Sequence, residues 1–274
     1  MLSELHHFKK KIIFLKGRQL MMKENELREI WEQEEHVAHI RGWDFSHIRD
    51  RYEEGRNLPW NYRTIVEEYR KDWKQLLDYD TGGAEFLLSL HHPYDKTAAT
   101  EGYEPNVALC REKLIPLGID FRKCDNPSDV PYEDASFDLI LNRHGEFDPL
   151  EIKRLLARDG IFLTQQVGCD NDRDLVEMVL PGLPKPFPDM NLAEQRYAFE
   201  QAGFQILRAE EAYRPIKFYD VGAFVWFAHI IEWEFPDFSV DRCFERLLEM
   251  QRVLERDDVI QGTIHRYLIC AQKK

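Results

Sequence analysis

The sequence has few cysteines, a deficit of positive charge and little apolar sequence that is unbroken. Its five cysteines are odd in number and scattered, and no C-x-x-C pair points to zinc or to a redox centre, so we expect reduced thiols. Fifty acidic side chains against 37 basic ones give a formal net charge of −13. A field of that sign repels phosphate backbones, which disfavours nucleic acid as a partner.

The longest apolar stretch, Ala223 to Ile231, contains His229 and is much shorter than the roughly 20 residues that span a bilayer. Near the N-terminus, the apolar run that follows Lys11 is too short for a secretory signal. We therefore expect a soluble, cytoplasmic protein without a membrane partner.

Residues 1–21 differ in character from the rest, since they hold five basic groups and one acid. The amphipathic pattern begins only at Glu24. We expect residues 1–21 to be a disordered leader, with Met21 or Met22 as the natural start.

The order of apolar patterns predicts one α/β domain with helical additions, for which 274 residues are enough. Helical spacing over 24–40 and 60–73 predicts a helical cap over residues 22–73. Short apolar runs then alternate with helical segments, and this alternation is typical of a parallel sheet. The expected strands are 75–79, 97–101, 119–124, 137–141, 160–167, 204–208 and 266–271. The expected helices are 86–90, 106–117, 150–157, 191–203, 220–234 and 239–256, and Asn191 with Glu194 forms a capping-box pattern.

These patterns predict an α/β, Rossmann-like three-layer sandwich with a mostly parallel, seven-stranded sheet. The N-terminal cap precedes it, and a helical insertion over 220–256 precedes the last strand. The main domain is expected over residues 74–274.

A glycine-bearing turn joins the first predicted strand of that domain to a helix, which is where α/β proteins bind nucleotides. Its candidate contacts are Asp78, Asp80, Thr81, Gly82 and Gly83. At the end of the second strand, Glu101 lies 23 positions after Asp78, close to the roughly 20-residue spacing of a ribose-binding carboxylate. Gly102 and Tyr103 follow it, and we expect Glu101 to hold both ribose hydroxyls.

The charge of this turn favours one class of cofactor. A dinucleotide would place its pyrophosphate beside Asp78, Asp80 and Glu85, which repel it. S-adenosylmethionine has no phosphate and carries an ammonium and a sulfonium, so an acidic turn suits it. The absence of a G-x-G-x-x-G run also disfavours an NAD-dependent oxidoreductase.

From Leu76 to Val167 the chain resembles the class I S-adenosylmethionine-dependent methyltransferases, and among them the bacterial methyltransferase type 11 group. Asp78 to Ala84 is similar to the first motif of that family, and Ala99 to Tyr103 to its ribose-binding segment. The resemblance places Asp125 and Asn126 beside the adenine ring. Phe137 to His144 resembles the fourth strand with its active-site end, and Leu155 to Phe162 the helix and turn before the fifth.

Two positions depart from the family, since Asp80 and Ala84 stand where it usually has glycine. Alanine adds one methyl group, and aspartate tolerates unusual backbone angles. We therefore expect cofactor binding to be weakened or reshaped and not abolished.

The end of the fourth strand is expected to line the ligand crevice with Asn142, Arg143, His144 and Glu146. Asn142 and Arg143 are assigned to the cofactor and Glu146 to the substrate. His144 is the candidate general base for an acceptor that keeps its proton, and the alternative is a structural histidine at a strand end.

Aromatic residues supply the remaining substrate candidates, Trp43, Trp60 and Trp226. They would form a substrate lid, or they would simply pack in the core. The paired histidines His6-His7 and His91-His92 have no completing cysteine or carboxylate, so no metal is expected.

Together these features predict an enzyme that transfers a methyl group from S-adenosylmethionine to a small molecule. Two alternatives stay open: an RNA base methyltransferase, and a non-catalytic protein that keeps the cofactor pocket but has lost turnover through Asp80 and Ala84. The acceptor, the attacked atom and the oligomeric state are not specified by any pattern.

Overall fold

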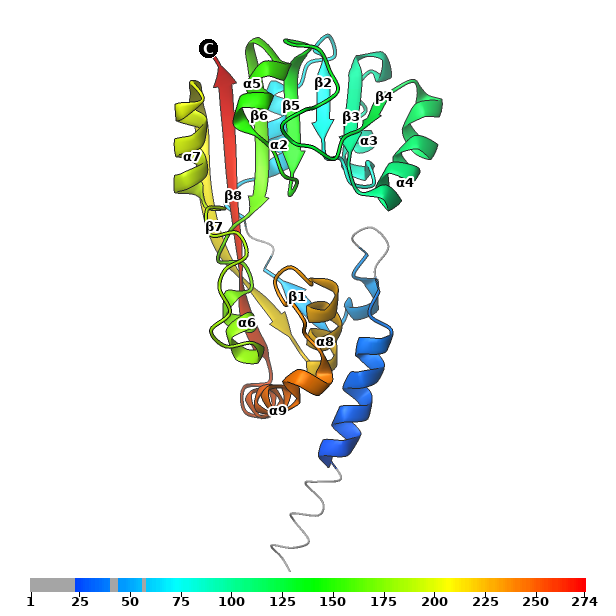
Figure 1. Cartoon of the computed structure of the whole chain (residues 1–274), viewed down its shortest axis with the longest axis vertical. Coiled ribbons are helices and arrows are strands. Elements are labelled where there is room, and N and C mark those ends of the chain that lie inside the picture. Colours follow the sequence, from blue (N-terminus) through cyan, green and yellow to red (C-terminus); the bar gives the residue numbers. More distant parts are fainter. Residues whose placement is uncertain (1–22, 40–43, 56–57) are drawn as a thin grey trace, which may run out of the picture. The chain divides into compact units, whose positions relative to one another are not determined.

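The computed structural model describes residues 23–39, 44–55 and 58–274, which divide into two compact units (Figure 1). We call residues 58–171, 185–214 and 264–274 the sheet unit. The helical unit comprises the described residues up to Gly55 together with 172–184 and 215–263. The expected leader over residues 1–21 lies outside the described part of the chain.

One sheet of eight strands is found in the described residues, in the order β1-β7-β8-β6-β5-β2-β3-β4. The strands from β2 to β6 pair in parallel, whereas β8 pairs antiparallel with β6 and β1 antiparallel with β7. Their bounds are β1 Tyr52–Glu54, β2 Leu76–Tyr79, β3 Thr97–Glu101, β4 Asp120–Lys123, β5 Phe137–Arg143, β6 Leu156–Val167, β7 Phe204–Phe218 and β8 Ile260–Lys273.

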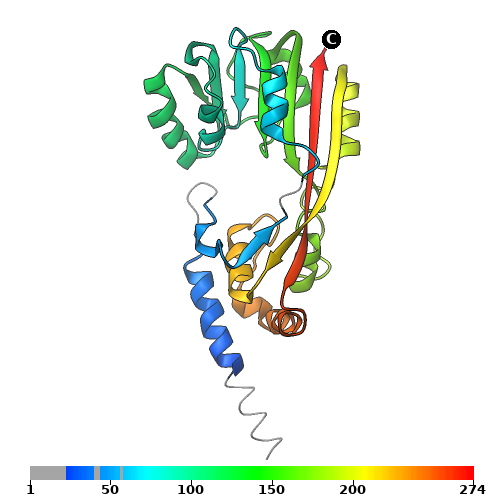
Figure 2. The ribbon, with the colours of Figure 1, turned by 180° about the vertical axis from the view of Figure 1, so that it is seen from behind.

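Helices cover both faces of the sheet unit, so it has three layers. On one face, α2 (Tyr62–Tyr69), α3 (Glu85–Ser89) and α4 (Glu104–Leu114) share a buried apolar cluster with inward residues of β2, β5 and β6. On the other face, α5 (Pro149–Leu155) and α7 (Leu192–Gln201) form the second cluster. Figure 1 shows α5 in front of the sheet, and Figure 2 shows α2 in front of it from behind. Burial on both faces explains why these strands read as short continuous apolar runs.

The helical unit is built around an apolar helix, α8 (Val221–Ile230), whose first eight residues are all buried. Asp220 caps it by accepting a hydrogen bond from the amide of Ala223 at 2.8 Å. Residues 23–36 are also helical, and the unit contains α6 (Arg173–Val179) and α9 (Val240–Asp257). The aromatic spacing noted in the sequence is thus a core pattern: the Phe224 ring lies 5.7 Å from that of Phe235, edge to face.

Several expected elements are confirmed closely. The strands at 97–101 and 75–79 are observed as β3 and β2. The Asn191 side chain caps α7 by accepting from the amide of Glu194 at 3.0 Å, and Gly203 ends the segment with φ of 82°.

Other expectations need correction. The sheet has eight strands instead of seven because β1 is only three residues long and contains two glutamates, too little for a strand pattern. β7 extends to Phe218, well beyond the expected end at 208, because its alternating charged positions hide the strand.

The division into units also differs from the expected boundary at residue 73. α2 belongs to the sheet unit, since Tyr62, Ile65 and Val66 pack in the same cluster as the strands. Helical spacing identifies a helix but not the surface that it covers. No helix among the described residues is long and apolar enough to cross a membrane.

Candidate functional site

The turn from Asp78 to Ala84 follows β2 at the carboxyl edge of the parallel strands. Three of its residues adopt left-handed backbone angles, with φ of 59° at Asp80, 63° at Gly82 and 65° at Ala84. Such angles cost a residue other than glycine about 1 kcal/mol. The two positions where the resembled family has glycine are therefore positions that require glycine-like geometry, and this chain adopts it with aspartate and alanine.

The Glu101 carboxylate is buried and organises the turn. One oxygen accepts a hydrogen bond from the amide of Gly82 at 2.7 Å, and the other accepts from the amides of Gly102 and Tyr103 at 3.0 and 2.9 Å. The strand-end carboxylate and the glycine turn predicted to meet therefore do so. Three of the lone-pair directions of Glu101 are used by the backbone.

Asp78 and Asp80 lie beside Glu101, and neither forms an ion pair with another described residue. Burial raises the pKa of Asp78 to about 6, although the Thr81 hydroxyl donates to this carboxylate at 2.5 Å and the charge of Arg143 opposes the shift. Burial and the neighbouring Glu101 raise the pKa of Asp80 to about 7. The site is therefore short of positive charge, and a bound cation would favour both carboxylates.

Contacts from more distant residues hold the turn in place, and sequence reasoning missed them. Cys110 of α4 donates to the carbonyl of Gly82 at 3.1 Å, and Lys113 donates to the carbonyl of Gly83 at 3.0 Å. Thr100 of β3 accepts from the amide of Asp80 at 3.2 Å through its hydroxyl. These residues lie on β3 and α4, the strand and the helix that come later in the chain than the turn. No known motif spacing predicts them.

The loop after β4 approaches the end of β3 closely. A side chain at Gly102 would lie 2.6 Å from the carbonyl oxygen of Cys124, so glycine is needed there. Asp125 and Asn126 follow in this loop and are exposed, and Asn126 accepts from the amide of Ser128 at 3.1 Å. Their assignment to the adenine ring stays a prediction.

Asn142 has a different environment from the one expected of a cofactor contact. Its side chain is fully buried, donates to the carbonyl of Tyr79 at 3.0 Å and accepts from Thr164 and Gln166 at 3.0 and 2.5 Å. It therefore joins β2, β5 and β6. The sequence correctly predicted that Asn142 lies at the strand end. Its side chain, however, points into the sheet and has a structural role.

The end of β5 and the turn after it reach the surface at Arg143, His144 and Glu146. Arg143 is exposed and its guanidinium lies 4.7 Å from the centre of the Phe86 ring, while Glu146 is exposed in the next turn. His144 has φ of 65° and also retains solvent-exposed surface. Even so, loss of water around its ring, followed by the charges of Arg266, Arg143 and Arg214, lowers the pKa of His144 to about 3. The lowered pKa favours the neutral form of the ring.

Two of the three tryptophans proposed for substrate are buried and present no surface to a ligand. Trp60 is buried in the sheet unit, where its indole donates to the Gln165 side chain at 2.8 Å. Trp226 is buried in the helical unit on α8. Trp43 lies outside the described residues. For Trp60 and Trp226 the alternative of core packing is the one that the structure favours.

Comparisons with solved structures agree on the fold. One similar chain is a proposed methyltransferase from Bacillus halodurans, with 13% identity, a TM-score of 0.55, and coverage of 78% of this chain and 98% of that one. Another is a functionally unknown protein from Deinococcus radiodurans, with 15% identity, a TM-score of 0.53 and coverage of 81% and 91%. The YcgJ protein from Bacillus subtilis has 16% identity, a TM-score of 0.53 and coverage of 78% and 97%. No protein-family model and no curated protein sequence matches this chain.

These similarities and the sheet order show that the chain has the Rossmann-like α/β fold of class I methyltransferases. The expected resemblance is confirmed at the level of the fold. Membership of the type 11 group stays a prediction, since sequence identities of this size identify a fold alone.

Proposed function

We propose that this protein binds S-adenosylmethionine at the turn after β2 and transfers its methyl group to a small molecule. The observation that carries the proposal is the gathering of Asp78, Asp80 and the buried Glu101 at the glycine turn after β2, where burial raises the pKa of both aspartates. A sulfonium and an ammonium would supply the positive charge that the turn lacks, whereas a pyrophosphate would add to the repulsion.

The electrostatics of His144 bear on the acceptor. Methyl transfer from a sulfonium requires alignment and exclusion of water more than acid–base help. A histidine with a pKa of about 3 is too weak a base to remove a proton from a hydroxyl at neutral pH. We therefore propose an acceptor that attacks without giving a proton to His144, such as a thiolate or an amine that binds in its neutral form. The alternative acceptor, an RNA base, is disfavoured by the net charge of −13.

One observation favours the second candidate, a non-catalytic cofactor-binding protein. The Asp80 carboxylate packs against Gly145, so that a side chain at Gly145 would lie 2.3 Å from an Asp80 oxygen. Asp80 therefore fills space between the turn and the end of β5. A side chain that fills this space favours a protein that binds a ligand at the turn without turning it over.

Calorimetric titration with S-adenosylmethionine and S-adenosylhomocysteine tests the proposal. We expect micromolar dissociation constants, about −8 kcal/mol, for the wild type. Glu101→Gln should weaken binding at least tenfold, because it removes the charge and replaces one of the two oxygens that accept from the turn with an NH2 group that cannot accept. Glu104→Gln, at the neighbouring first position of α4, is the matched control and should bind normally.

The two candidates differ in turnover. A methyltransferase consumes S-adenosylmethionine when supplied with a mixture of small amines and thiols, and releases S-adenosylhomocysteine. If the wild type binds S-adenosylmethionine but releases no S-adenosylhomocysteine, and if Asp80→Gly behaves in the same way, the non-catalytic protein is favoured. No binding by either variant or wild type would contradict both candidates.

A further inference from the structure

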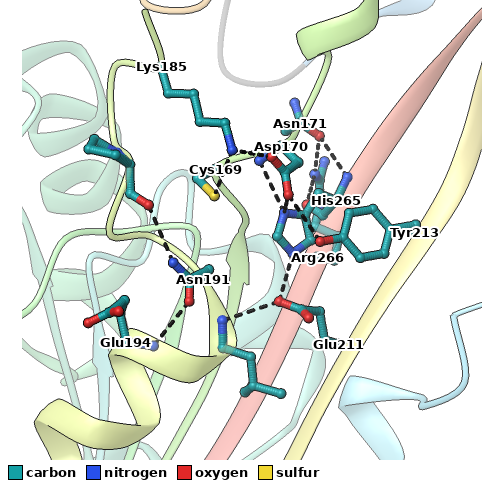
Figure 3. A network of polar contacts seen from close by, with 12 residues as sticks. Cys169, Asp170, Asn171, Lys185, Asn191, Glu194, Glu211, Tyr213, His265 and Arg266 are labelled. Carbon is teal, nitrogen blue, oxygen red and sulfur yellow. Dashed lines mark hydrogen bonds and ion pairs between the residues drawn. The ribbon is translucent and has the colours of Figure 1, made fainter.

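A second cluster of polar side chains lies at the carboxyl end of β6, where Cys169, Asp170 and His265 come together (Figure 3). The thiol sulfur, a carboxylate oxygen and a ring nitrogen all lie within 4.8 Å of one another. We propose that these three side chains bind a zinc ion. Cys169 and His265 are 96 positions apart in sequence, so no spacing motif could have indicated the site.

The antiparallel pairing of β6 with β8 brings the cluster together. Val167 pairs with Arg266, which sets the chain after β6 beside His265. Gly168 allows the imidazole to approach, because a side chain at this position would lie 2.2 Å from ring atoms of His265. The amide of Gly168 also donates to the carbonyl of His265 at 3.0 Å. The backbone therefore fixes the position of the ring before any ion is bound.

His265 has the carboxylate partner that is usual for a metal-binding histidine, although its other ring nitrogen accepts a hydrogen bond from the amide of Asp170. Its Nε2 lies 3.0 Å from a Glu211 carboxylate oxygen, which assigns the ring proton to Nε2 and leaves the lone pair on Nδ1. A carboxylate behind an imidazole is the usual partner of a metal-binding histidine. The ring is fully buried and stacks on Tyr213, with ring centres 4.4 Å apart and planes 16° apart.

A cation already occupies the neighbourhood. The Lys185 ammonium forms an ion pair with Asp170 and lies 3.7 Å from the Cys169 sulfur, as Figure 3 shows. The Tyr213 hydroxyl donates to the second Asp170 oxygen at 3.1 Å. The ammonium thus lies between the two ligand groups that a metal would join, and it would have to move away when zinc binds.

The competing contacts are weak compared with zinc ligation. The amide of Asp170 donates to Nδ1 of His265 at 3.1 Å, and zinc would displace this bond as well as the Lys185 ion pair. Loss of one such hydrogen bond or of one half-exposed ion pair weakens binding by about tenfold or less. Ligation by a thiolate, an imidazole and a carboxylate together has to exceed these two costs for zinc to bind.

The ligand set favours zinc over other common cations. Thiolate and imidazole are ligands of zinc and of related transition metals, whereas magnesium and calcium select oxygen. Three protein ligands leave a fourth position for water, as in zinc sites that are not closed. Bound zinc would tie the chain after β6 to β8.

The test uses the purified full-length chain, freed of metal with a chelator and titrated with zinc and, separately, with cobalt(II). We expect one ion per chain and a near-ultraviolet thiolate-to-cobalt absorption band. Cys169→Ser should remove the band and weaken zinc binding at least 100-fold. Cys124→Ser, a second partly buried cysteine outside the cluster, is the matched control and should change neither.

Lys185→Ala separates a metal site from a plain ion-pair cluster. If the ammonium competes with the ion, this variant binds zinc about tenfold more tightly, and Glu211→Gln binds it about tenfold more weakly. The proposal is overturned if the wild type shows no cobalt band, or if the band persists in Cys169→Ser. It is overturned equally if Lys185→Ala lowers zinc affinity. Circular dichroism confirms that each variant is folded, and none of these measurements depends on the methyltransferase proposal.

Discussion

Two clusters of carboxylates lie at the carboxyl edge of the same parallel strands, and their proton affinities have shifted in opposite directions. At the turn after β2, burial raises the pKa of Asp78 to about 6 and that of Asp80 to about 7. After β6, the hydrogen bond from Lys185 lowers the pKa of Asp170, against the effect of burial. Among the described residues, neither Asp78 nor Asp80 forms an ion pair, whereas Asp170 is paired with Lys185. The comparison indicates that the first is prepared for a cationic ligand, whereas in the second an ion must compete with Lys185.

Gly168→Ala should have the largest effect on stability, because the new methyl group would lie 2.2 Å from the buried His265 ring. Overpacking of this kind costs about 3 kcal/mol when neither the ring nor the backbone can move away. Urea denaturation would measure the loss of unfolding free energy. A loss below about 1 kcal/mol would show that the His265 ring is free to move.

Asp80 should make stability depend on pH in an unusual direction. Since its pKa is raised from 3.8 to about 7, the folded protein holds this proton more tightly than the unfolded chain. This contribution is fully present below about pH 4 and is lost as the pH rises through 7. Asp80→Asn should therefore exceed the wild type in stability at pH 8, by on the order of 2 kcal/mol, and the difference should shrink toward pH 4. Thermal denaturation at several pH values would measure it.

Asp170 provides the opposite case and the control. Its pKa is lowered, so its contribution to stability is present at neutral pH and is lost as the pH falls below about 4. Asp170→Asn should thus be less stable than the wild type at pH 8, by less than 1 kcal/mol because the ion pair is half-exposed. Equal pH dependence in the two variants would contradict the contrast between the clusters.

The difference between the clusters also separates what sequence could predict from what it could not. The first lies on consecutive elements, so a strand, a glycine turn and Glu101 at the next strand end are readable as a local pattern. The second joins residues from the segment after β6, from β7 and from β8, and its ligands meet through a register that no local pattern encodes. Trp60 and Asn142 show a further limit, since residue type and strand position do not tell which way a side chain points.

Gly82→Ala should have a smaller effect than Gly168→Ala. A side chain at Gly82 meets no atom within 4 Å, so only the left-handed backbone angle of 63° opposes it. The expected loss is about 1 kcal/mol. Urea denaturation of both variants under the same conditions checks the order. A loss at Gly82 that equals or exceeds the loss at Gly168 would mean that backbone angle, and not space, limits both turns.

The smallest expected effect concerns His144, which lies between the clusters. Arg143 follows the first site on β5 and Arg266 belongs to the strand of the second, and both contribute to its low pKa. The ring resonances of His144, assigned by their absence in His144→Gln, should therefore not move between pH 5 and 8 in nuclear magnetic resonance spectra. Arg266→Gln should raise the pKa of His144, because among the neighbouring charges that of Arg266 lowers this pKa the most. A midpoint near 6.5 in the wild type would contradict the assignment of a neutral ring and would restore His144 as a general base, which would reopen hydroxyl acceptors.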